Sequence, residues 1–422
     1  MEVKPGYKQT DVGVVPVEWD VKSLAFVAEK IMVGIASAAT HAYRVKGVPM
    51  FRNQNIKVGC LDDSDVLFVD PEYEFTFRNK RLRGGDLLTA RTGYPGTTCV
   101  VPLCYESAQS FTTLITRPKQ SEVESNYLCH YINSEAGQRF FTQSQIGGAQ
   151  KNVNAGTLRL MPIPIPRLPE QRAIAGALSD VDALLGALDQ FIAKKRDLKL
   201  AAMQQLLTGQ TRLPGFHGEW AMKRLGDAGK CLRGVSYNGD TDLSTHDKHC
   251  TKRLLRSNNV QDAVVVTDEV QFVNAARVSS HQLLKKNDIL ICMANGSKAL
   301  VGKAGLFNVN DGFEYTFGAF MGCFRTDSAA SNAAFVFYLF QTGRYRNYIN
   351  NLLAGSSINN LRPSSIESLE FSIPPLPEQT AIAEVLTDMD AEQAALEQRR
   401  AKTRALKQGM MQELLTGRTR LL

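Results

Sequence analysis

The chain of 422 residues lacks the sequence features by which many enzymes and membrane proteins are recognised. No phosphate-binding loop of the form GxxxxGKS or GxxxxGKT occurs. An adenine methyltransferase needs an Asn/Asp-Pro-Pro-Tyr/Phe loop, whereas the Pro-Pro pair present here is Pro374-Pro375. The longest apolar run, residues 333–340, is far shorter than the roughly 20 residues of a membrane-spanning helix. These absences argue against a nucleotide-hydrolysing enzyme, a self-contained methyltransferase and an integral membrane protein.

The sequence also lacks CxxC motifs and a large net charge. The eight cysteines are scattered without a CxxC motif, which is typical of a reducing compartment. His246, His249 and Cys250, with Cys231 upstream, are the one metal-like group, but tetrahedral zinc needs two ligand pairs at defined spacing, so a solvated loop is favoured. The net charge of +7 permits a polyanionic partner without requiring one. We therefore expect a soluble cytoplasmic protein without a metal or cofactor.

What the sequence does contain is a long internal repeat. The segment 168–213 returns from Leu376 onward, and a constant shift of 208 residues aligns Pro169 with Pro377 and Gly209 with Gly417 without a gap. More than half of the aligned positions are identical. A repeat of this length constrains the architecture more than any other feature, so it predicts a chain of two equivalent halves.

Each copy of the repeat predicts one long helix. Proline suits the first helical turn, and glycine suits the left-handed residue that ends a helix. About 40 residues lie between these marks, or about 60 Å of helix. Apolar residues in the first copy step by four and three, as in a coiled-coil seam: Ile174, Leu178, Val181, Leu185, Leu188 and Ile192. The second copy keeps Ile382, Leu386, Met389 and Leu396 but places Gln393 and Arg400 on the seam. We expect the two helices to pair antiparallel.

The remaining sequence predicts two α/β (α+β) domains. Glu18-Trp19 opens the first domain and Glu219-Trp220 opens the second. We expect strands at 66–69, 87–89, 98–101, 264–267 and 289–292, and one amphipathic helix late in each domain, at 125–141 and 332–350. Proline-rich connectors, 161–166 and 371–375, should be extended. The expected order is a first domain at 1–160, a helix at 161–213, a second domain at 214–370 and a helix at 371–422, with residues 1–15 passing back toward the second helix.

The doubled LPEQ(x)AIA helix start, the doubled LLTG(x)TRL helix end, the two Pro-rich entries and the two Glu-Trp openings together resemble the specificity subunit of type I restriction–modification systems. The resemblance covers essentially the whole chain. It implies two target-recognition domains and a non-catalytic subunit that selects an asymmetric, bipartite sequence in double-stranded DNA. It also implies two adenine methyltransferase subunits and restriction subunits as partners.

Amide and arginine side chains are the candidates for reading bases, because Arg pairs with guanine and Asn or Gln with adenine, while Lys and Arg neutralise phosphates. In the first domain the candidates are Arg52, Asn53, Asn55, Arg91, Tyr94, Gln143, Gln145, Lys151 and Asn152. In the second they are Arg256, Asn258, Asn259, Asn295, Ser297, Lys298, Arg346, Ser356 and Asn359. For any one of them, an ordinary surface or turn residue is the more frequent outcome.

A basic cluster occurs once in each long helix and in the same phase. It comprises Lys194, Arg196 and Lys199, and their counterparts Lys402, Arg404 and Lys407. A solvated helix face is the plain interpretation, but the duplication favours a role in docking partner subunits over a grip on DNA phosphates. Two other functions remain open at this point: a specificity subunit of a fused, type II-like nuclease–methyltransferase, and a free-standing DNA-binding regulator. A coiled-coil scaffold without a DNA role is a third possibility.

Overall fold

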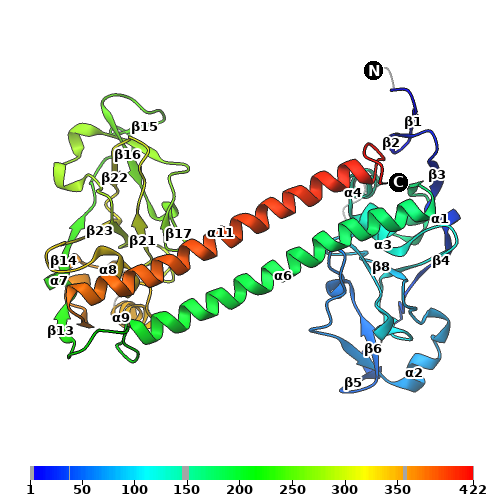
Figure 1. Cartoon of the computed structure of the whole chain (residues 1–422), viewed down its shortest axis with the longest axis horizontal. Helices are drawn as coiled ribbons and strands as arrows, with labels where there is room; N and C mark the ends of the chain where they lie inside the picture. The colour runs from blue at the N-terminus through cyan, green and yellow to red at the C-terminus, as the bar shows by residue number, and fades with distance from the viewer. Residues whose placement is uncertain (1–3, 38, 145–151, 355–358, 422) are drawn as a thin grey trace. The chain divides into compact units, whose positions relative to one another are not determined.

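The computed structural model describes residues 4–37, 39–144, 152–354 and 359–421. The chain forms two compact units (Figure 1). The first unit comprises Met1–Gln190 and Gln398–Leu422, and the second comprises Phe191–Glu397. Each unit therefore contains one mixed domain together with parts of the two long helices, α6 (Leu168–Leu206) and α11 (Leu376–Leu414). Among the described residues, no helix is long and apolar enough to cross a membrane.

The first unit builds its domain from small antiparallel and mixed sheets. Its strands are β1 (Tyr7–Thr10), β2 (Gly13–Pro16), β3 (Asp20–Ser23), β4 (Ala28–Val33), β5 (Tyr43–Arg44), β6 (Val48–Phe51), β7 (Leu67–Val69), β8 (Leu87–Thr89), β9 (Thr98–Val100), β10 (Gln109–Ser110), β11 (Leu114–Pro118) and β12 (Pro162–Ile165). Its helices before α6 are α1 (Leu24–Val27), α2 (Pro71–Phe75), α3 (Ser125–Asn133), α4 (Glu135–Ser144) and α5 (Ala155–Arg159). Short 3-10 turns are η1 (Thr40–Ala42), η2 (Asn53–Asn55), η3 (Arg78–Lys80) and η4 (Leu103–Tyr105).

The second unit repeats this plan. Its strands are β13 (Ala221–Arg224), β14 (Gly229–Arg233), β15 (Leu243–Ser244), β16 (Thr251–Leu255), β17 (Val260–Gln261), β18 (Val264–Val265), β19 (Gln271–Asn274), β20 (Asp288–Cys292), β21 (Ala304–Phe307), β22 (Tyr315–Phe317), β23 (Met321–Thr326) and β24 (Glu370–Ile373). Its helices before α11 are α7 (Leu225–Ala228), α8 (Ala333–Leu339), α9 (Gly343–Ala354) and α10 (Pro363–Glu367), and its 3-10 turns are η5 (Ser257–Asn259), η6 (Ala275–Arg277) and η7 (Ser280–Gln282).

The sheets of the two units correspond strand by strand. The order β4-β11-β8-β9 in the first unit matches β14-β23-β20-β21 in the second, where β18 and β17 extend the sheet. Likewise β10-β6-β7-β5 matches β22-β16-β19-β15. The expected strands at 66–69, 87–89, 98–101, 264–267 and 289–292 are present as β7, β8, β9, β18 and β20. Sequence repetition thus produces the same topology twice, which confirms the predicted mixed helix-and-sheet fold with an internal repeat.

The proline-rich connectors are more than extended linkers. Each forms a two-stranded antiparallel sheet with the strand that opens its own domain: β12 pairs with β3, and β24 pairs with β13. Pro162 and Pro164 are tolerated in β12 because the sheet has only two strands, so a missing N–H can lie on the unpaired side; β24 ends before Pro374. The connectors therefore fasten each domain to the helix that follows it.

The predicted helix in each domain is wrong in one respect, because the segment contains two helices. In the first unit Ser134 separates α3 from α4, and its Oγ accepts a hydrogen bond from the Gly137 amide. In the second unit Thr342 lies between α8 and α9 and its Oγ1 accepts from the Tyr345 amide. A hydroxyl placed before a first turn caps a new helix, so these residues begin the second helix rather than continue the first.

The ends of the two long helices agree with the sequence. Both helices have 39 residues, and Leu168 and Leu376 precede the prolines in their first turns. Gly209 and Gly417 have φ values of +72° and +68°, the left-handed conformation that ends a helix. On the seam, Ile174, Leu178, Leu188 and Ile192 are buried in α6, and Ile382 and Leu386 are buried in α11; Val181, Leu185, Met389, Gln393, Leu396 and Arg400 are partly buried.

Ion pairs between the long helices establish an antiparallel register in each unit. In the first unit Lys407 binds Asp182, with Nζ 2.5 Å from Oδ1. In the second unit Lys199 binds Asp390. Each residue of one pair lies 208 positions from its counterpart in the other pair, the same shift that aligns the sequence repeat. Arg400, a polar residue of the seam, also forms an ion pair between the helices, with its Nη1 2.9 Å from Asp189 Oδ1.

The LPEQ motif is explained by a buried joint at the start of each helix. In the second unit the Glu378 carboxylate accepts hydrogen bonds from Arg212 Nε (2.5 Å), Arg212 Nη2 (2.7 Å) and Trp220 Nε1 (3.2 Å). The neighbouring Gln379 donates to the Pro374 carbonyl and accepts from the Asn332 amide. One tetrapeptide motif thus ties together the helix start, the Glu-Trp domain opening and the arginine of the TRL motif.

The first unit contains the same joint. Glu170 accepts from Trp19 Nε1 (3.2 Å) and from Arg420 Nη2 (2.9 Å). Because Arg420 follows α11, this joint includes the segment after the second long helix. Tyr7 donates from its hydroxyl to the Gly417 carbonyl at 3.1 Å. Tyr7 therefore lies against the segment that follows the second long helix, as expected for residues 1–15.

A buried histidine attaches the first domain to the helix pair. His130 in α3 is 7% exposed, and its Nε2 lies 3.3 Å from Ser179 Oγ of α6. Burial, together with the nearby Lys407 cation, lowers the pKa of His130 to about 4, although Asp182 acts in the opposite direction. In the second unit Tyr338 makes the corresponding attachment, since its hydroxyl donates to Asp390 Oδ2 at 2.7 Å.

The depressed pKa of His130 predicts acid sensitivity of the first unit. An unfolded histidine has a pKa near 6.5, so between about pH 6.5 and about pH 4 the unfolded state binds more protons and folding weakens as the pH falls. From pH 7 to pH 5 we expect a loss of about 2 kcal/mol from this residue. Urea unfolding of wild type and His130→Gln at both pH values measures it. An equally steep acid loss in the variant would contradict the assignment.

Candidate nucleic-acid interface

Three segments that are distant in the sequence converge in the first unit. Asn53 Oδ1 in η2 accepts from the Arg91 amide at 2.7 Å, which joins η2 to the loop after β8. Arg91 and Val153 then exchange two hydrogen bonds, Val153 N to the Arg91 carbonyl (3.2 Å) and Arg91 Nε to the Val153 carbonyl (3.3 Å). Asn53 also donates to Thr112 Oγ1 at 3.3 Å. The candidates Asn53, Arg91 and Asn152 therefore share one surface.

The corresponding segments converge in the second unit. Asn295, in the loop after β20, donates from Nδ2 to Ser257 Oγ in η5 at 3.4 Å. Its amide donates to the Asn359 carbonyl, and Asn359 Nδ2 returns a bond to the Gly296 carbonyl at 3.2 Å. Asn295 Oδ1 accepts from the Ser297 amide, which shapes the loop itself. Sequence reasoning placed candidates on all three segments, and the structure brings them together. We call these three segments in each unit the loop cluster.

Two predicted base readers have a structural role instead. Asn55 and Asn259 are buried, and the side-chain amide of each forms its hydrogen bonds within its own turn. Asn259 accepts from the Arg256 amide (2.9 Å) and donates to the carbonyls of Val266 (3.2 Å) and Asp268 (2.9 Å). Asn55 makes the same three bonds, with Arg52, Asp62 and Asp65. A buried, fully bonded amide cannot meet a base edge, so this part of the prediction is corrected. The repeated RxxN spacing was the signal for this turn.

The arginines at the start of these turns, Arg52 and Arg256, differ in their hydrogen-bond and ion-pair partners. Arg52 Nη2 donates to the carbonyl and to Oδ2 of Asp65, at 2.9 and 2.8 Å. No ion pair of Arg256 occurs among the described residues, and its Nε, like that of Arg52, is buried without a hydrogen-bond partner. Arg346 is occupied internally, because it donates to the carbonyls of Val301 and Lys298 and so supports the loop after β20.

The remaining candidates are solvent-exposed or outside the described residues. Tyr94, Gln143, Asn152, Asn258, Ser297 and Lys298 are exposed, and Asn359 and Asn295 are partly buried. Gln145, Lys151 and Ser356 lie outside the described residues. Gln143 is on α4, and no bond between it and the loop cluster is seen in the described part of the chain. The exposed amides, hydroxyl and ammonium groups make this surface able to bind a polyanion and to form hydrogen bonds with base edges.

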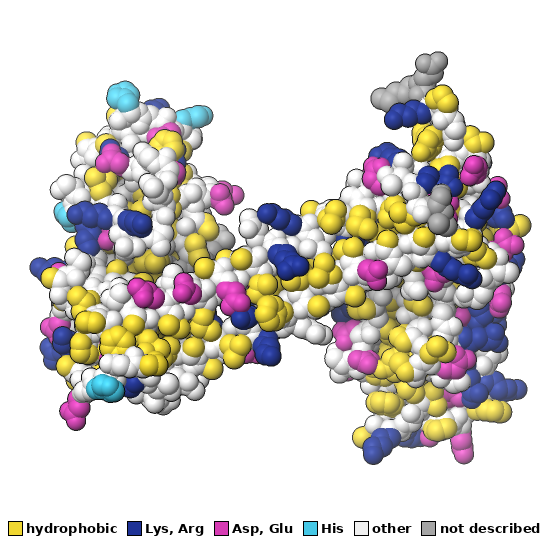
Figure 2. All heavy atoms as spheres, in the orientation of Figure 1, with side chains coloured by type: hydrophobic (Ala, Val, Ile, Leu, Met, Phe, Trp, Pro, Cys, Tyr) yellow, Lys and Arg dark blue, Asp and Glu magenta, His cyan; other side chains and the backbone are white. Residues whose placement is uncertain are grey.

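The duplicated basic cluster on the helices divides into two groups. Lys199, Arg196 and Lys407 form ion pairs with acidic residues of the opposite helix. Lys194, Lys402 and Arg404 are exposed, and no ion pair of theirs is found in the described ranges. Apolar side chains are also exposed on the helices: Leu184, Phe191, Leu198 and Leu200 on α6, and Val385 and Leu406 on α11. Figure 2 shows hydrophobic and basic side chains together on the visible surface of the helices.

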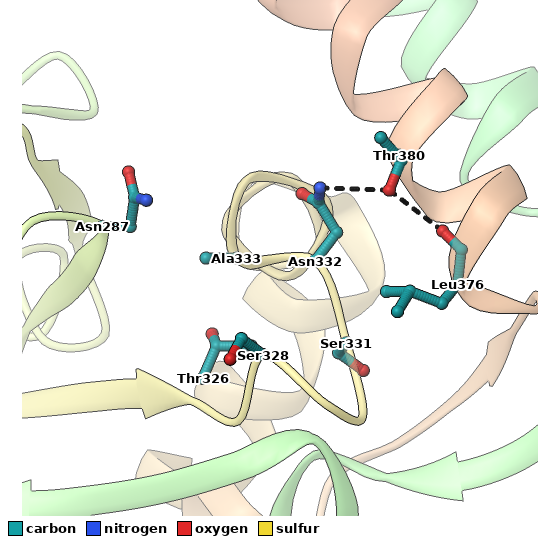
Figure 3. A pocket seen from close by; sticks show the side chains of 8 residues that line it. All are labelled: Asn287, Thr326, Ser328, Ser331, Asn332, Ala333, Leu376 and Thr380. Atoms are coloured by element: carbon teal, nitrogen blue, oxygen red, sulfur yellow. Dashed lines mark hydrogen bonds between the residues drawn. The ribbon is translucent and has the colours of Figure 1, made fainter.

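A pocket of about 310 Å³ lies in the second unit, between the turn before β20, the end of β23 and the starts of α8 and α11 (Figure 3). Uncharged residues line it: Asn287, Thr326, Ser328, Ser331, Asn332, Ala333, Leu376 and Thr380. Asn332 caps α8 and donates to Thr380 Oγ1, which in turn donates to the Leu376 carbonyl. The lining offers neutral hydrogen-bonding groups and lacks a paired acid and base, so it does not assemble the elements of a catalytic site.

Metal-ligating residues do not gather within the described ranges. No group of three or more His, Cys, Asp or Glu side chains there could hold a metal ion. His246, His249 and Cys250 are exposed, whereas Cys231 is buried in β14.

Comparison with known proteins gives this surface a context. The family model for the type I restriction modification DNA specificity domain matches residues 16–194 and again 217–405. The type I restriction enzyme EcoKI specificity subunit of Escherichia coli (strain K12) is 33% identical over 183 residues, which cover 42% of this chain and 39% of that subunit. The type I restriction enzyme MjaVIII specificity subunit of Methanocaldococcus jannaschii is 24% identical over 324 residues, 74% of each chain.

Solved structures share the fold. The S subunit of a type I restriction–modification system from M. genitalium has a TM-score of 0.60 at 12% identity, covering 98% of both chains. A chain from a structure concerned with assembly and conformational transition of the type I R-M system has a TM-score of 0.56 at 17% identity and covers 96% of this chain and 99% of its own. Each family match spans one domain and most of the long helix that follows it. The chain belongs to the type I restriction modification DNA specificity domain family.

Proposed function

We propose that this chain is the DNA-recognition subunit of a type I restriction–modification complex, and that each unit reads one half of a bipartite site in double-stranded DNA. The observation that carries the proposal is the loop cluster, because it presents amide and basic side chains from three segments at equivalent places in both units. Asn and Gln suit adenine, Arg suits guanine, and Lys suits phosphate. This chemistry belongs to sequence readout.

The two loop clusters carry different side chains, which supports an asymmetric target. Tyr94 and Arg91 follow β8 in the first unit, whereas Asn295, Ser297 and Lys298 follow β20 in the second. Different donors and acceptors select different bases, so the two half-sites should differ in sequence. Since the two units are separate compact bodies, base pairs between the half-sites should go unread.

Catalysis is assigned to partner subunits. We propose two adenine methyltransferase subunits and restriction subunits as partners, in a cytoplasmic complex, and a non-catalytic role for this chain. The exposed leucines and the exposed Lys194, Lys402 and Arg404 on the long helices support a docking role for the helices. Exposed apolar area that is bordered by charge is typical of protein interaction surfaces.

The direct experiment is mapping of adenine methylation in cells that carry the partner methyltransferase. With this chain present, we expect one bipartite methylated motif with an unread spacer. Without it, that motif should be unmethylated. An unchanged methylation pattern would contradict the proposal.

Binding of the purified complex to its mapped site tests the loop cluster. Lys298→Gln in the second unit should weaken binding to all sequences alike and reduce the slope of log K against log salt by about 1, as loss of one phosphate contact does. Lys286→Gln is the matched control, because this exposed lysine precedes β20, at the opposite end of the strand from Lys298. Equal effects of the two variants would remove Lys298 from the interface.

A further inference from the structure

One exposed aromatic ring lies beside the second loop cluster, on the turn between β22 and β23. Phe320 is 72% exposed, yet its backbone is firmly held. The Phe320 carbonyl accepts hydrogen bonds from the amides of Met293 (2.9 Å) and Ala294 (3.1 Å) at the end of β20. The same turn is closed by Met321 N to the Gly318 carbonyl at 2.8 Å. The ring is therefore presented to solvent from a rigid turn, not from a flexible loop end.

The residues that surround this turn are the candidate DNA contacts. The Gly318 amide donates to the Leu255 carbonyl at 3.0 Å, and Arg256 and Ser257 follow directly. Ala294, which bonds Phe320, precedes Asn295. The apolar ring thus lies among groups that can bind phosphates or form hydrogen bonds with base edges. A phenyl ring can neither neutralise a phosphate nor form a hydrogen bond with a base edge.

The first unit presents a ring at the equivalent surface from a different loop. Tyr94 is 85% exposed and follows Arg91 in the loop after β8. Its carbonyl accepts from the Thr97 amide at 3.1 Å. The loop is constrained further at Gly96, where an added Cβ would lie 2.3 Å from Phe141 Cδ2. Each unit therefore presents one projecting ring, at or beside its loop cluster, on a constrained backbone.

Phe320 and Tyr94 differ from the other exposed rings. Lys22 and Lys119 lie over Phe26, Arg78 lies over Phe75, and Arg253 lies over Phe313. In the ranges that the structure describes, no cation or second ring packs on Phe320 or Tyr94. Exposed apolar side chains of DNA-binding proteins can enter a base step and unstack it, and aromatic rings stack on bases of any sequence.

We propose that Phe320 and Tyr94 stack into the DNA of their respective half-sites, each entering a base step as an aromatic wedge. The inference rests on the DNA-recognition function proposed above and adds to it a local unstacking of the target. The surrounding amide and basic groups fix the position of the protein along the DNA. The ring then enters the base step that lies opposite it in that position. Recognition then depends on how easily that step opens as well as on base edges.

The test uses the complex of this chain with its methyltransferase and duplexes that carry the mapped site, with 2-aminopurine placed in turn at each adenine of the second half-site on either strand, except the adenine that is methylated, which the methyltransferase itself unstacks. Binding of wild type should raise the fluorescence at one step, because 2-aminopurine brightens when it loses its stacked neighbour. Phe320→Ala should lose that signal and weaken specific binding about 5- to 100-fold. Phe320→Leu should keep most of the signal because it retains an apolar wedge. Phe313→Ala, another exposed ring of the same unit, is the control.

A second arm separates the wedge from an ordinary contact. A mismatched base pair at the step where 2-aminopurine brightens removes most of the free-energy cost of unstacking. The mismatch should therefore tighten DNA binding by wild type and reduce the difference in affinity between Phe320→Leu and wild type. The parallel series with Tyr94→Ala covers the first half-site. Specific binding without a bright step, or a bright step unchanged in Phe320→Ala, overturns the wedge and leaves the recognition function standing. Failure of wild type to bind its site specifically would instead overturn the proposed function.

Discussion

Replacing Glu378 by alanine is expected to lower the opening free energy of the second unit by about 3 kcal/mol. Glu378 is 1% exposed and accepts three hydrogen bonds, two from Arg212 and one from Trp220. Its removal leaves the Trp220 N–H without an acceptor and the guanidinium without its counter-charge. The loss should concentrate where β13, β24 and the start of α11 meet.

Hydrogen exchange followed by mass spectrometry measures this loss and locates it. Glu370→Ala is the matched control, because Glu370 pairs with Arg224 at the surface, where an ion pair contributes about 1 kcal/mol or less. Faster exchange in the second unit with little change in the first is the expected pattern. A Glu378→Ala protein as well protected as the control would show that the joint does not hold the domain to its helix.

Replacing Asn259 by alanine is expected to cost about 3 kcal/mol of stability in the second unit, because one buried amide and two carbonyls lose their partner at once. Asn55→Ala should have a similar effect in the first unit, where the same three bonds occur. The turn that carries Arg256 would lose its support, so any loss of DNA binding should follow from a disordered turn.

The neighbouring Asn258 provides the control. It is exposed, and its side chain makes no bond to the turn within the described residues. Asn258→Ala should therefore leave the urea midpoint unchanged within error, while Asn259→Ala shifts it markedly. If Asn259→Ala retained full stability and changed only the DNA sequence that is bound, the structural assignment of this asparagine would be wrong.

The long helices could be predicted closely because local rules determine them. Proline in the first turn, glycine beyond the last turn and a seam with steps of four and three are each read from adjacent residues. The repeat then predicted that a domain followed by a long helix would occur twice, and the sheets of the two units do correspond. The split of the late helices was missed because Ser134 and Thr342 act through capping hydroxyls inside an unbroken amphipathic pattern.

The candidate site was predicted only in part, because burial depends on contacts between distant segments. Asn53 and Asn55 are neighbours of the same type, yet one joins the loop cluster and the other is buried in its own turn. The partners of Asn259 are seven and nine residues away. Phe320 was not a candidate, since a single phenylalanine in a strand-rich stretch indicates a core residue, and only the structure shows it exposed.

The central claim is that each unit chooses its own half of the DNA target. Exchange of residues 16–160 for the first domain of another family member, followed by methylation mapping in cells with the partner methyltransferase, tests it most directly. We expect one half-site to change while the other half-site and the spacer persist, because the second unit keeps its own core, joint and loop cluster. Alteration of both half-sites, or of neither, would contradict it.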